Sequence, residues 1–403
     1  MTVIKQLSVA TVAGIFLSLL TVGKTFAYTF TKIADTRDSS FRYIGFDGPA
    51  INNEGIVAFE ASLDAMGNNG IFIGSGGAIT TVVGKSSSFG PQLGNPTINN
   101  AATVAFVAER NMNELGIFTN SGGVTNTIAA FSGSPPYLVR YFNRAIDIND
   151  NGTVAFVAIP DAIEGLEGVF TSNGEETTTI VDNTGTLKNL FRIPTINNDG
   201  TVAFAAELRA GGQGLFTYNN GVITTIAQTG RPFDIYGSPV INNEGTIAFG
   251  ASQGNTRGIY TSKDGVITTI GDDSGSFNYF EYMQFLPALN DRGTVAFKGF
   301  LDAGGEGIFT GSDPVTDKVI AFGDTLSGST VRSLILSYNG LNNFGQIAFW
   351  AEFTDGTSGV FRADPGSKSV PEPAFVLGLL IVGVLGIPFR YKLLRSRVRS
   401  HSG

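Results

Sequence analysis

The stretch Ile241-Asn242-Asn243-Glu244-Gly245-Thr246-Ile247-Ala248-Phe249 decides the fold, because variants of it recur along the chain. The six other copies start at Ile51, Ile98, Ile148, Ile196, Leu289 and Leu341. Successive copies start 45 to 52 residues apart, so the chain is an array of seven similar units. The fold therefore follows from the structure of one unit and from the way the units join.

Each unit reads as four short strands joined by turns. A short apolar piece ends in Ile-Asn or Leu-Asn, and an Asn/Asp-x-Gly turn leads to a strand such as Thr201–Ala206. A Gly-apolar-aromatic strand such as Gly214–Phe216 follows, and then a Thr-rich, β-branched strand such as Val222–Ala227. Four antiparallel strands in 45 to 52 residues match one β-propeller blade, whereas a β-helix needs a shorter period.

The composition of the second strand suits a blade that neighbours cover on both faces. In Thr-Val-Ala-Phe the Ala leaves room where adjacent sheets approach, and the Phe fills the wider gap. A Gly in the turn supplies a positive φ. The second unit has Ala101-Ala102 in that turn, which predicts a turn of a different kind.

The two ends of the array complete one another. The seventh unit stops after Gly359-Val360-Phe361-Arg362 and lacks its Thr-rich strand, while Tyr28–Ala34 matches that missing strand. The chain should therefore form an all-β, seven-bladed β-propeller over residues 28–364, with four antiparallel strands per blade. The N-terminal strand closes the ring and covers sheet edges that would otherwise be exposed.

The first 27 residues have the pattern of a signal peptide. Lys5 precedes an apolar run over residues 9–22, and Thr25-Phe26-Ala27 places small residues before a cut between Ala27 and Tyr28. This pattern predicts export and removal by signal peptidase. An uncleaved anchor helix is the alternative.

The C-terminal end carries a second targeting pattern. A polar linker over residues 365–370 precedes Pro371-Glu372-Pro373 and an apolar run over residues 374–389, short but long enough for a transmembrane helix. The cations that follow should stay on the cytoplasmic side; they are Arg390, Lys392, Arg395, Arg397 and Arg399. Over residues 371–399 the chain resembles the PEP-CTERM sorting signal of Gram-negative bacteria. That resemblance implies transient anchoring in the inner membrane and cleavage by an exosortase, and a plain tail anchor is the alternative.

The repeats also resemble the choice-of-anchor tandem-repeat proteins, defined by Asn-x-x-Gly-x-x-Ala-Phe. All seven copies keep the Asn and the Ala-Phe, as in Asn242 and Ala248-Phe249, and six keep the Gly. The resemblance implies a protein of the cell surface or extracellular matrix with an exchangeable sorting tail. It implies no particular activity.

Composition excludes several functions. Residues 28–370 hold 19 Lys and Arg against 33 Asp and Glu, a net charge of −14, which argues against a nucleic-acid partner. The chain has no Cys, and its one histidine, His401, lies in the tail that sorting would remove. A Ser-His or Cys-His nucleophile is therefore excluded from the mature domain, and no metal site or cofactor is predicted.

Two acidic patterns imitate functional sites but also have structural explanations. Asp147-x-Asn149-x-Asn151-Gly152 imitates the start of a calcium loop, but Ala158 stands where the loop needs an acid, so turn capping is favoured. Glu109, Glu207 and Glu352 share one position in units two, four and seven. They would serve a glycosidase only if two came close together, and solvated strand ends are favoured.

Binding residues are expected on the long variable loops between blades and between the second and third strands, which should lie on one face. Several carry aromatic residues, which can stack on sugar rings or pack in the core. The candidate ligand contacts are Tyr137, Tyr141, Phe142, Tyr236, Phe280 and Tyr282.

Three functions remain in competition. The favoured hypothesis is a non-catalytic binding or matrix protein, with extracellular polysaccharide or another surface protein as its partner. A carboxylate-dependent glycoside hydrolase or lyase, and a structural adhesion module, are the alternatives. An enzyme needs converging acids, whereas a binding protein needs an aromatic or amide-lined patch without them.

Overall fold

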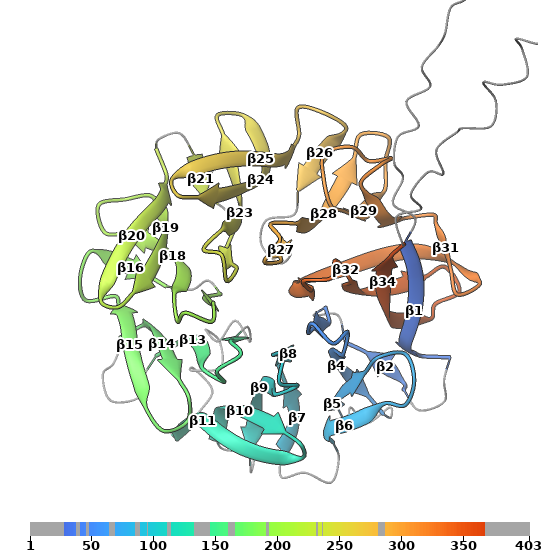
Figure 1. The fold of residues 1–403 in the computed structure, drawn as a ribbon, viewed down its shortest axis with the longest axis horizontal. Helices are drawn as coiled ribbons and strands as arrows, with labels where there is room; N and C mark the ends of the chain where they lie inside the picture. Colours follow the sequence, from blue (N-terminus) through green and yellow to red (C-terminus); the bar gives the residue numbers. More distant parts are fainter. Residues whose placement is uncertain are drawn as a thin grey trace, which may run out of the picture. The chain divides into compact units, whose positions relative to one another are not determined.

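The computed structural model describes residues 28–37, 41–45, 48–63, 69–84, 89–94, 96–110, 114–132, 146–159, 166–190, 193–230, 233–235, 237–280 and 287–366. Their strands form seven antiparallel sheets set around a common centre (Figure 1). The prediction of an all-β, seven-bladed propeller is confirmed. Within the described ranges no helix is long and apolar enough to cross a membrane.

Each sheet is one blade, and the bounds of its strands follow the repeat. Blade 1 contains β2 (Tyr43–Ile44), β3 (Ala50–Ile51), β4 (Val57–Ser62), β5 (Asn69–Gly74) and β6 (Thr80–Val83). Blade 2 contains β7 (Phe89–Leu93), β8 (Thr97–Ile98), β9 (Val104–Arg110), β10 (Glu114–Ser121) and β11 (Val124–Ser132). Blade 3 contains β12 (Asp147–Ile148), β13 (Val154–Ala158), β14 (Gly168–Ser172) and β15 (Thr177–Asp182).

The next three blades repeat this order. Blade 4 contains β16 (Leu187–Asn189), β17 (Thr195–Ile196), β18 (Val202–Leu208), β19 (Gln213–Asn219) and β20 (Val222–Gln228). Blade 5 contains β21 (Phe233–Ile235), β22 (Val240–Ile241), β23 (Ile247–Gln253), β24 (Thr256–Lys263) and β25 (Val266–Asp272). Blade 6 contains β26 (Phe277–Phe280), β27 (Ala288–Leu289), β28 (Val295–Leu301), β29 (Glu306–Phe309) and β30 (Lys318–Ala321).

Blade 7 closes the ring by combining the two ends of the described chain. It contains β31 (Thr325–Leu326), β32 (Ser329–Leu341), β33 (Ile347–Phe353), β34 (Ser358–Pro365) and β1 (Tyr28–Asp35). The N-terminal β1 pairs antiparallel with β34, from Tyr28 opposite Pro365 to Asp35 opposite Gly359. The predicted closing strand is therefore confirmed, and residues 28–366 form a closed structural unit.

The predicted targeting segments lie outside the described residues. This applies to residues 1–27, to the linker beyond Gly366, and to the sorting signal with its apolar run over residues 374–389. Of the predicted signal-cleavage pair Ala27 and Tyr28, the structure describes Tyr28, the first residue of β1.

Adjacent blades pack on one another through alternating small and large residues. In β4, Ala58 packs in the core between blades 1 and 2, whereas Phe59 packs in the core between blades 1 and 7. The repeat Phe is at most 2% exposed in every blade, as Phe59, Phe106 and Phe249 illustrate. Full burial of one such ring stabilises the fold by about 1.5–3 kcal/mol, so the Ala-Phe pair is a packing element.

The glycine of the Gly-apolar-aromatic strand is required because the aromatic ring two positions later occupies the space of a side chain. A Cβ at Gly70 would lie 2.7 Å from Cζ of Phe72, and one at Gly116 would lie equally close to Phe118. The aromatic ring folds back over the glycine, so only a residue without a side chain fits there.

The prediction of a different turn in the second repeat is wrong. Ala102 takes a φ of 56°, close to the 74° of Gly245 in the fifth repeat. Its N–H donates to the Asn99 carbonyl at 3.0 Å, as the Gly245 N–H does to Asn242 at 3.2 Å. The surrounding ring imposes one turn geometry on all seven repeats.

Candidate functional site

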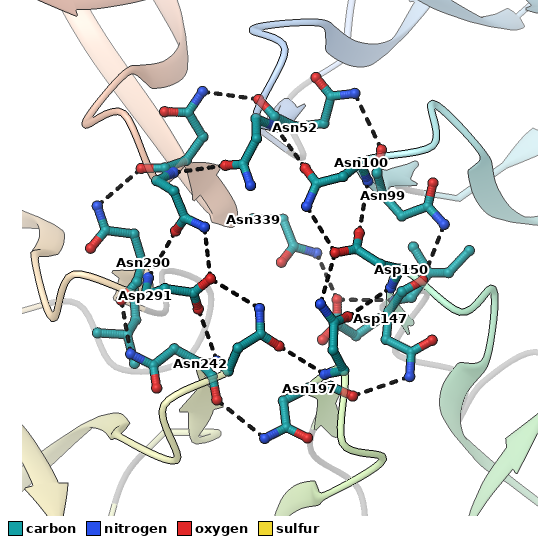
Figure 2. Close-up of a pocket in the computed structure, with 18 of the residues that line it drawn as sticks. Asn52, Asn99, Asn100, Asp147, Asp150, Asn197, Asn242, Asn290, Asp291 and Asn339 are labelled. Carbon is teal, nitrogen blue, oxygen red and sulfur yellow. Dashed lines mark hydrogen bonds between the residues drawn. The ribbon is translucent and has the colours of Figure 1, made fainter.

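The seven Asn turns meet at the centre of the ring, where they line a polar cavity of about 140 Å³ (Figure 2). We call this cavity the cup. Its walls come from all seven blades, so the site is assembled only when the ring is closed.

The first asparagine of every turn forms a buried inner ring. Its members are Asn52, Asn99, Asn149, Asn197, Asn242, Asn290 and Asn342. Each side-chain Nδ2 donates to the backbone carbonyl of the next member, at 2.9 to 3.3 Å. The last bond runs from Asn342 to Asn52, so the series closes on itself.

The same side chains also hold their own turns. The Oδ1 of Asn242 accepts the N–H groups of Glu244 at 3.1 Å and Thr246 at 2.8 Å. Asn149 does the same for Asn151 and Thr153, so its oxygen caps the turn, as the sequence predicts. The inner ring is therefore structural, and its hydrogen-bonding groups are occupied.

The second residue of every turn forms an outer ring, which is only partly buried. Its members are Asn53, Asn100, Asp150, Asn198, Asn243, Asp291 and Asn343. Each backbone N–H donates to the side-chain oxygen of the next member, at 2.8 to 2.9 Å. These polar side chains of the cup are more exposed than those of the inner ring.

Two carboxylates interrupt this ring of amides. Asp150 accepts the side-chain amides of Asn100 at 2.9 Å and Asn198 at 2.8 Å, which flank it in blades 2 and 4. Asp291 accepts those of Asn243 and Asn343 in the same way. The amides hold both carboxylates in place and leave the cup negatively charged.

An insertion from blade 7 reaches across the centre of the ring. The pairing of β32 with β33 is interrupted between Leu336 and Leu341. Within this interruption, the Tyr338 hydroxyl donates to the Ile146 carbonyl at 2.7 Å. Asn339 Nδ2 donates to Thr97 Oγ1 at 2.8 Å and to Asp147 Oδ1 at 3.2 Å. We call residues 337–340 the plug, since they link blade 7 to blades 2 and 3.

Asp147 is the strongly perturbed acid of the cup. It is 7% exposed, and burial raises its pKa to about 6, although hydrogen bonds from Ile196, Asn339 and Ile148 oppose that rise. The Ile196 N–H donates to its Oδ2 at 2.9 Å. Asp147 is therefore a buried carboxyl that changes charge near neutral pH.

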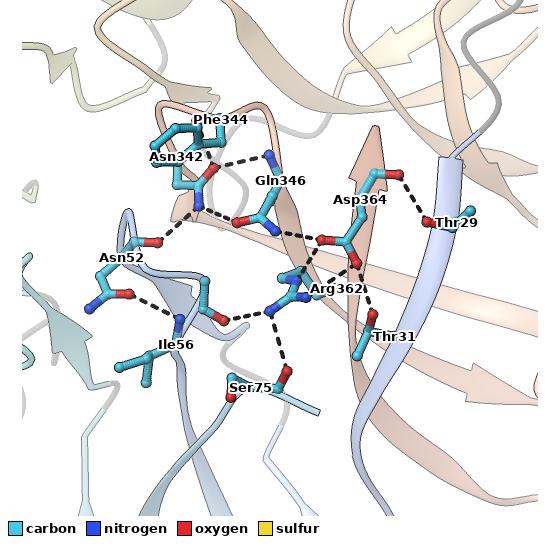
Figure 3. A network of polar contacts seen from close by, with 11 residues as sticks. Thr29, Thr31, Asn52, Ile56, Ser75, Asn342, Phe344, Gln346, Arg362 and Asp364 are labelled. Atoms are coloured by element: carbon cyan, nitrogen blue, oxygen red, sulfur yellow. Dashed lines mark hydrogen bonds and ion pairs between the residues drawn. The ribbon is translucent and has the colours of Figure 1, made fainter. Parts of the chain in front are cut away.

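A polar network surrounds the point where the inner ring passes from blade 7 to blade 1 (Figure 3). Asn342 Nδ2 donates to Gln346 Oε1 at 2.8 Å, and Gln346 Nε2 donates to Asp364. Arg362 Nε donates to Asp364 at 2.7 Å, while its Nη1 donates to the Gly55 carbonyl at 2.8 Å. The cup and the closing strands are thus one connected structure.

Of the six predicted aromatic contacts, the structure describes only Phe280. Phe280 is 1% exposed and packs against Phe277 and Phe297, with ring centroids 5.4 and 5.7 Å away. It is a core residue and offers no face to a sugar. The other candidates lie outside the described residues; they are Tyr137, Tyr141, Phe142, Tyr236 and Tyr282.

The three glutamates of the enzyme alternative stay in separate, non-adjacent blades. Glu207 lies 3.6 Å from Lys188, and Glu352 lies 3.7 Å from Arg332, each within its own blade. Glu109 stands near the end of β9. Across the described ranges no three His, Cys, Asp or Glu side chains gather as a metal site would require.

Sequence reasoning missed the cup, although a signal for it was present. The pattern predicts a turn residue at the Asn that defines each repeat, which is correct but incomplete. Seven such turns at one radial position of a closed ring must face a common centre, so their number and constancy are a signal for a polar lining. The plug had a weaker signal, the 52 residues between Leu289 and Leu341, the longest spacing in the array.

Three overlapping segments of the sequence, residues 6–182, 81–338 and 336–377, match a family of unknown function, DUF7453. The chain belongs to this family. Together the segments span the whole propeller of this DUF7453 protein. No curated protein matches the chain.

Solved structures similar to this DUF7453 chain are β-propellers or contain one. The β-propeller domain of the Trilobed protease from Pyrococcus furiosus is 12% identical, with a TM-score of 0.54, over 83% of this chain and 99% of that one. An oligogalacturonate lyase from Vibrio parahaemolyticus is 12% identical, with a TM-score of 0.51, over 85% and 98%. A puromycin-hydrolyzing peptidase from Mycobacterium tuberculosis is 12% identical, with a TM-score of 0.53, over 85% and 55%. At these identities the similarity shows the fold alone.

Proposed function

We propose that this chain is an exported, non-catalytic surface protein that binds a polyhydroxylated ligand, such as extracellular polysaccharide, in the cup. The observation that carries the proposal is the outer ring of partly exposed amide and carboxylate side chains. Amides donate and accept hydrogen bonds, as sugar hydroxyls do, and the interlocked ring holds them in fixed positions.

The targeting patterns at the two ends of the sequence support a location at the cell surface, where such binding would occur. Residues 1–27 have the features of a signal peptide, and residues 371–399 resemble a PEP-CTERM signal read by an exosortase. A protein released or attached at the surface of a Gram-negative-type cell meets extracellular polysaccharide and other surface proteins. Recovery of the protein from its native cell surface with an intact C-terminus would count against sorting cleavage.

A glycan and exopolysaccharide screen on residues 28–366 tests the binding proposal. Asn100→Ala with Asn243→Ala removes two amides of the outer ring and should abolish binding that occurs in the cup. Asn126→Ala, an exposed change on the outer strand β11, is the matched control and should bind like the parent. Binding that survives the paired change places the ligand elsewhere, and no binding to any glycan overturns the proposal.

A carboxylate-dependent hydrolase or lyase is the second candidate, and Asp147 is the observation that favours it. A buried acid with a pKa of about 6 beside a polar cavity is a common feature of acid-base catalysts. Product analysis on every glycan that binds separates the two functions. Turnover that Asp147→Asn removes would establish the enzyme, and binding without turnover would establish the binding protein.

A further inference from the structure

Blade 4 differs from five of the other blades in the packing of its aromatic core. In five blades an additional ring stands edge-on to the aromatic residue of the third strand. The pairs are Phe41–Phe72, Phe89–Phe118, Phe233–Tyr260, Phe277–Phe309 and Phe353–Phe361, with ring centroids 4.8 to 5.7 Å apart. In blade 4 the corresponding place is held by Leu187, next to Phe216.

A hollow of about 670 Å³ lies where that ring is missing. Its apolar lining comes from Leu187, Leu208, Phe216 and Ile223, and Thr225 and Gln228 stand at its side. Ile223 is 50% exposed, so the hollow opens to solvent beside the outer strand β20. Its volume is within the range of small-molecule sites and exceeds that of one aromatic ring.

Blade 2 shows what fills the same place. There Phe89 packs on Phe118, and the Arg110 guanidinium lies 4.2 Å from the centroid of Phe118 and 5.3 Å from that of Phe89. In blade 4, Leu187 and Leu208 are the counterparts of Phe89 and Arg110, because the two residues of each pair lie directly opposite one another on paired strands. Two shorter side chains therefore replace a ring and a guanidinium.

One wall of the hollow is fixed by hydrogen bonds. The Arg209 guanidinium donates to the carbonyls of Gly185, at 2.9 Å, and Asn183, and the Arg209 N–H donates to the Thr186 carbonyl at 2.9 Å. These bonds hold the segment that connects blade 3 to blade 4. The hollow is pre-formed, which lowers the entropy lost when a ligand enters.

We propose that this hollow is a second binding site, separate from the cup, which takes an aromatic ring from a ligand into the place that Phe fills in other blades. The extra volume next to β20 accommodates the groups that carry the ring. Edge-to-face contact with Phe216 and burial against Leu187 supply the affinity. A free aromatic molecule and the side chain of a partner polypeptide share this chemistry.

Titration of residues 28–366 with indole and with N-acetylphenylalaninamide, followed by NMR, tests the proposal. Both should bind in the millimolar range, and tighter binding of the amide would indicate a polypeptide as the source. Leu187→Phe supplies the missing ring from the chain itself and should weaken binding at least tenfold. Val266→Ala, at an exposed valine of β25 outside the hollow, should bind like the parent.

A second variant keeps the test decisive if Leu187→Phe does not fold. Thr225→Phe narrows the hollow from the exposed strand β20 and should also weaken binding at least tenfold. Absence of binding to the parent protein, or equal binding by the parent and the filled variants, would overturn the proposal. Binding lost in either filled variant and kept in Val266→Ala would support it.

Discussion

Ala102 is the residue at which the ring overrides local preference. It holds a φ of 56°, a left-handed conformation that costs a non-glycine residue about 1–2 kcal/mol. Ala102→Gly should therefore raise the free energy of unfolding by about 1 kcal/mol, measured by urea denaturation. Gly245→Ala is the reverse control: a Cβ there meets no atom within 4 Å, so backbone strain alone should lower stability by a similar amount. A destabilising Ala102→Gly would contradict the turn geometry.

Asp147 should make stability depend on pH. Its pKa is about 6 in the folded protein against 3.8 for an ordinary Asp, so folding is favoured while the carboxyl is protonated. That contribution is fully present below about pH 4 and is lost as the pH rises through about 6, with a limit of about 3 kcal/mol. Urea midpoints between pH 4 and 8 should fall more steeply for the parent than for Asp147→Asn.

The exposed Asp199, in the Asn turn of blade 4, controls for loss of a charge. Asp199→Asn should follow the parent curve, and only Asp147→Asn should flatten it. Parallel curves for the parent and Asp147→Asn would show that Asp147 keeps one charge state in this range. A constant difference between the two sets of urea midpoints would reflect the altered bond with Asn339. The test therefore compares the slopes of the midpoints against pH.

At the level of strands, the sequence predicted the features that depend on the repeat period and on the order of the strands. The repeat of Ile241–Phe249 gave the blades, and the match of Tyr28–Ala34 to a missing strand gave the closure. Contacts between blades were harder, because the partner of a side chain such as Asn242 Nδ2 lies on a different repeat and follows only from the assembled ring. Phe280 shows a related limit: an aromatic residue near a loop reads alike whether it is exposed or buried.

Arg362 links β34 to blade 1 where the ring closes, so its substitution tests how much this contact stabilises the closure. It bonds to Asp364 within β34 and to the carbonyls of Gly55 and Ser75 in blade 1. Since its side chain is 14% exposed, Arg362→Met should lower the free energy of unfolding by about 2 kcal/mol. The matched change Arg332→Met removes an ion pair whose Arg side chain is 61% exposed and should cost less than about 0.5 kcal/mol. Equal effects would mean that Arg362 contributes nothing special to closure.

For the whole molecule, the two hydrogen-bonded rings connect every blade to both of its neighbours. The inner ring runs from Asn52 through each repeat to Asn342 and back to Asn52. Loss of one blade therefore breaks both series at once and removes the walls of the cup. A linear repeat array has no such constraint and can unfold from its ends.

This closure predicts that the propeller unfolds in one cooperative step. The single tryptophan, Trp350, is 2% exposed in blade 7, so its fluorescence reports on the closing blade, while circular dichroism reports on all strands. The two urea transitions should coincide. Asn242→Ala, in the distant blade 5, removes three hydrogen bonds and should shift both transitions by the same amount, about 3 kcal/mol. If Asn242→Ala left the Trp350 transition in place, blade 7 would be unfolding on its own, and the rings would link neighbouring blades without making the seven blades a single folding unit.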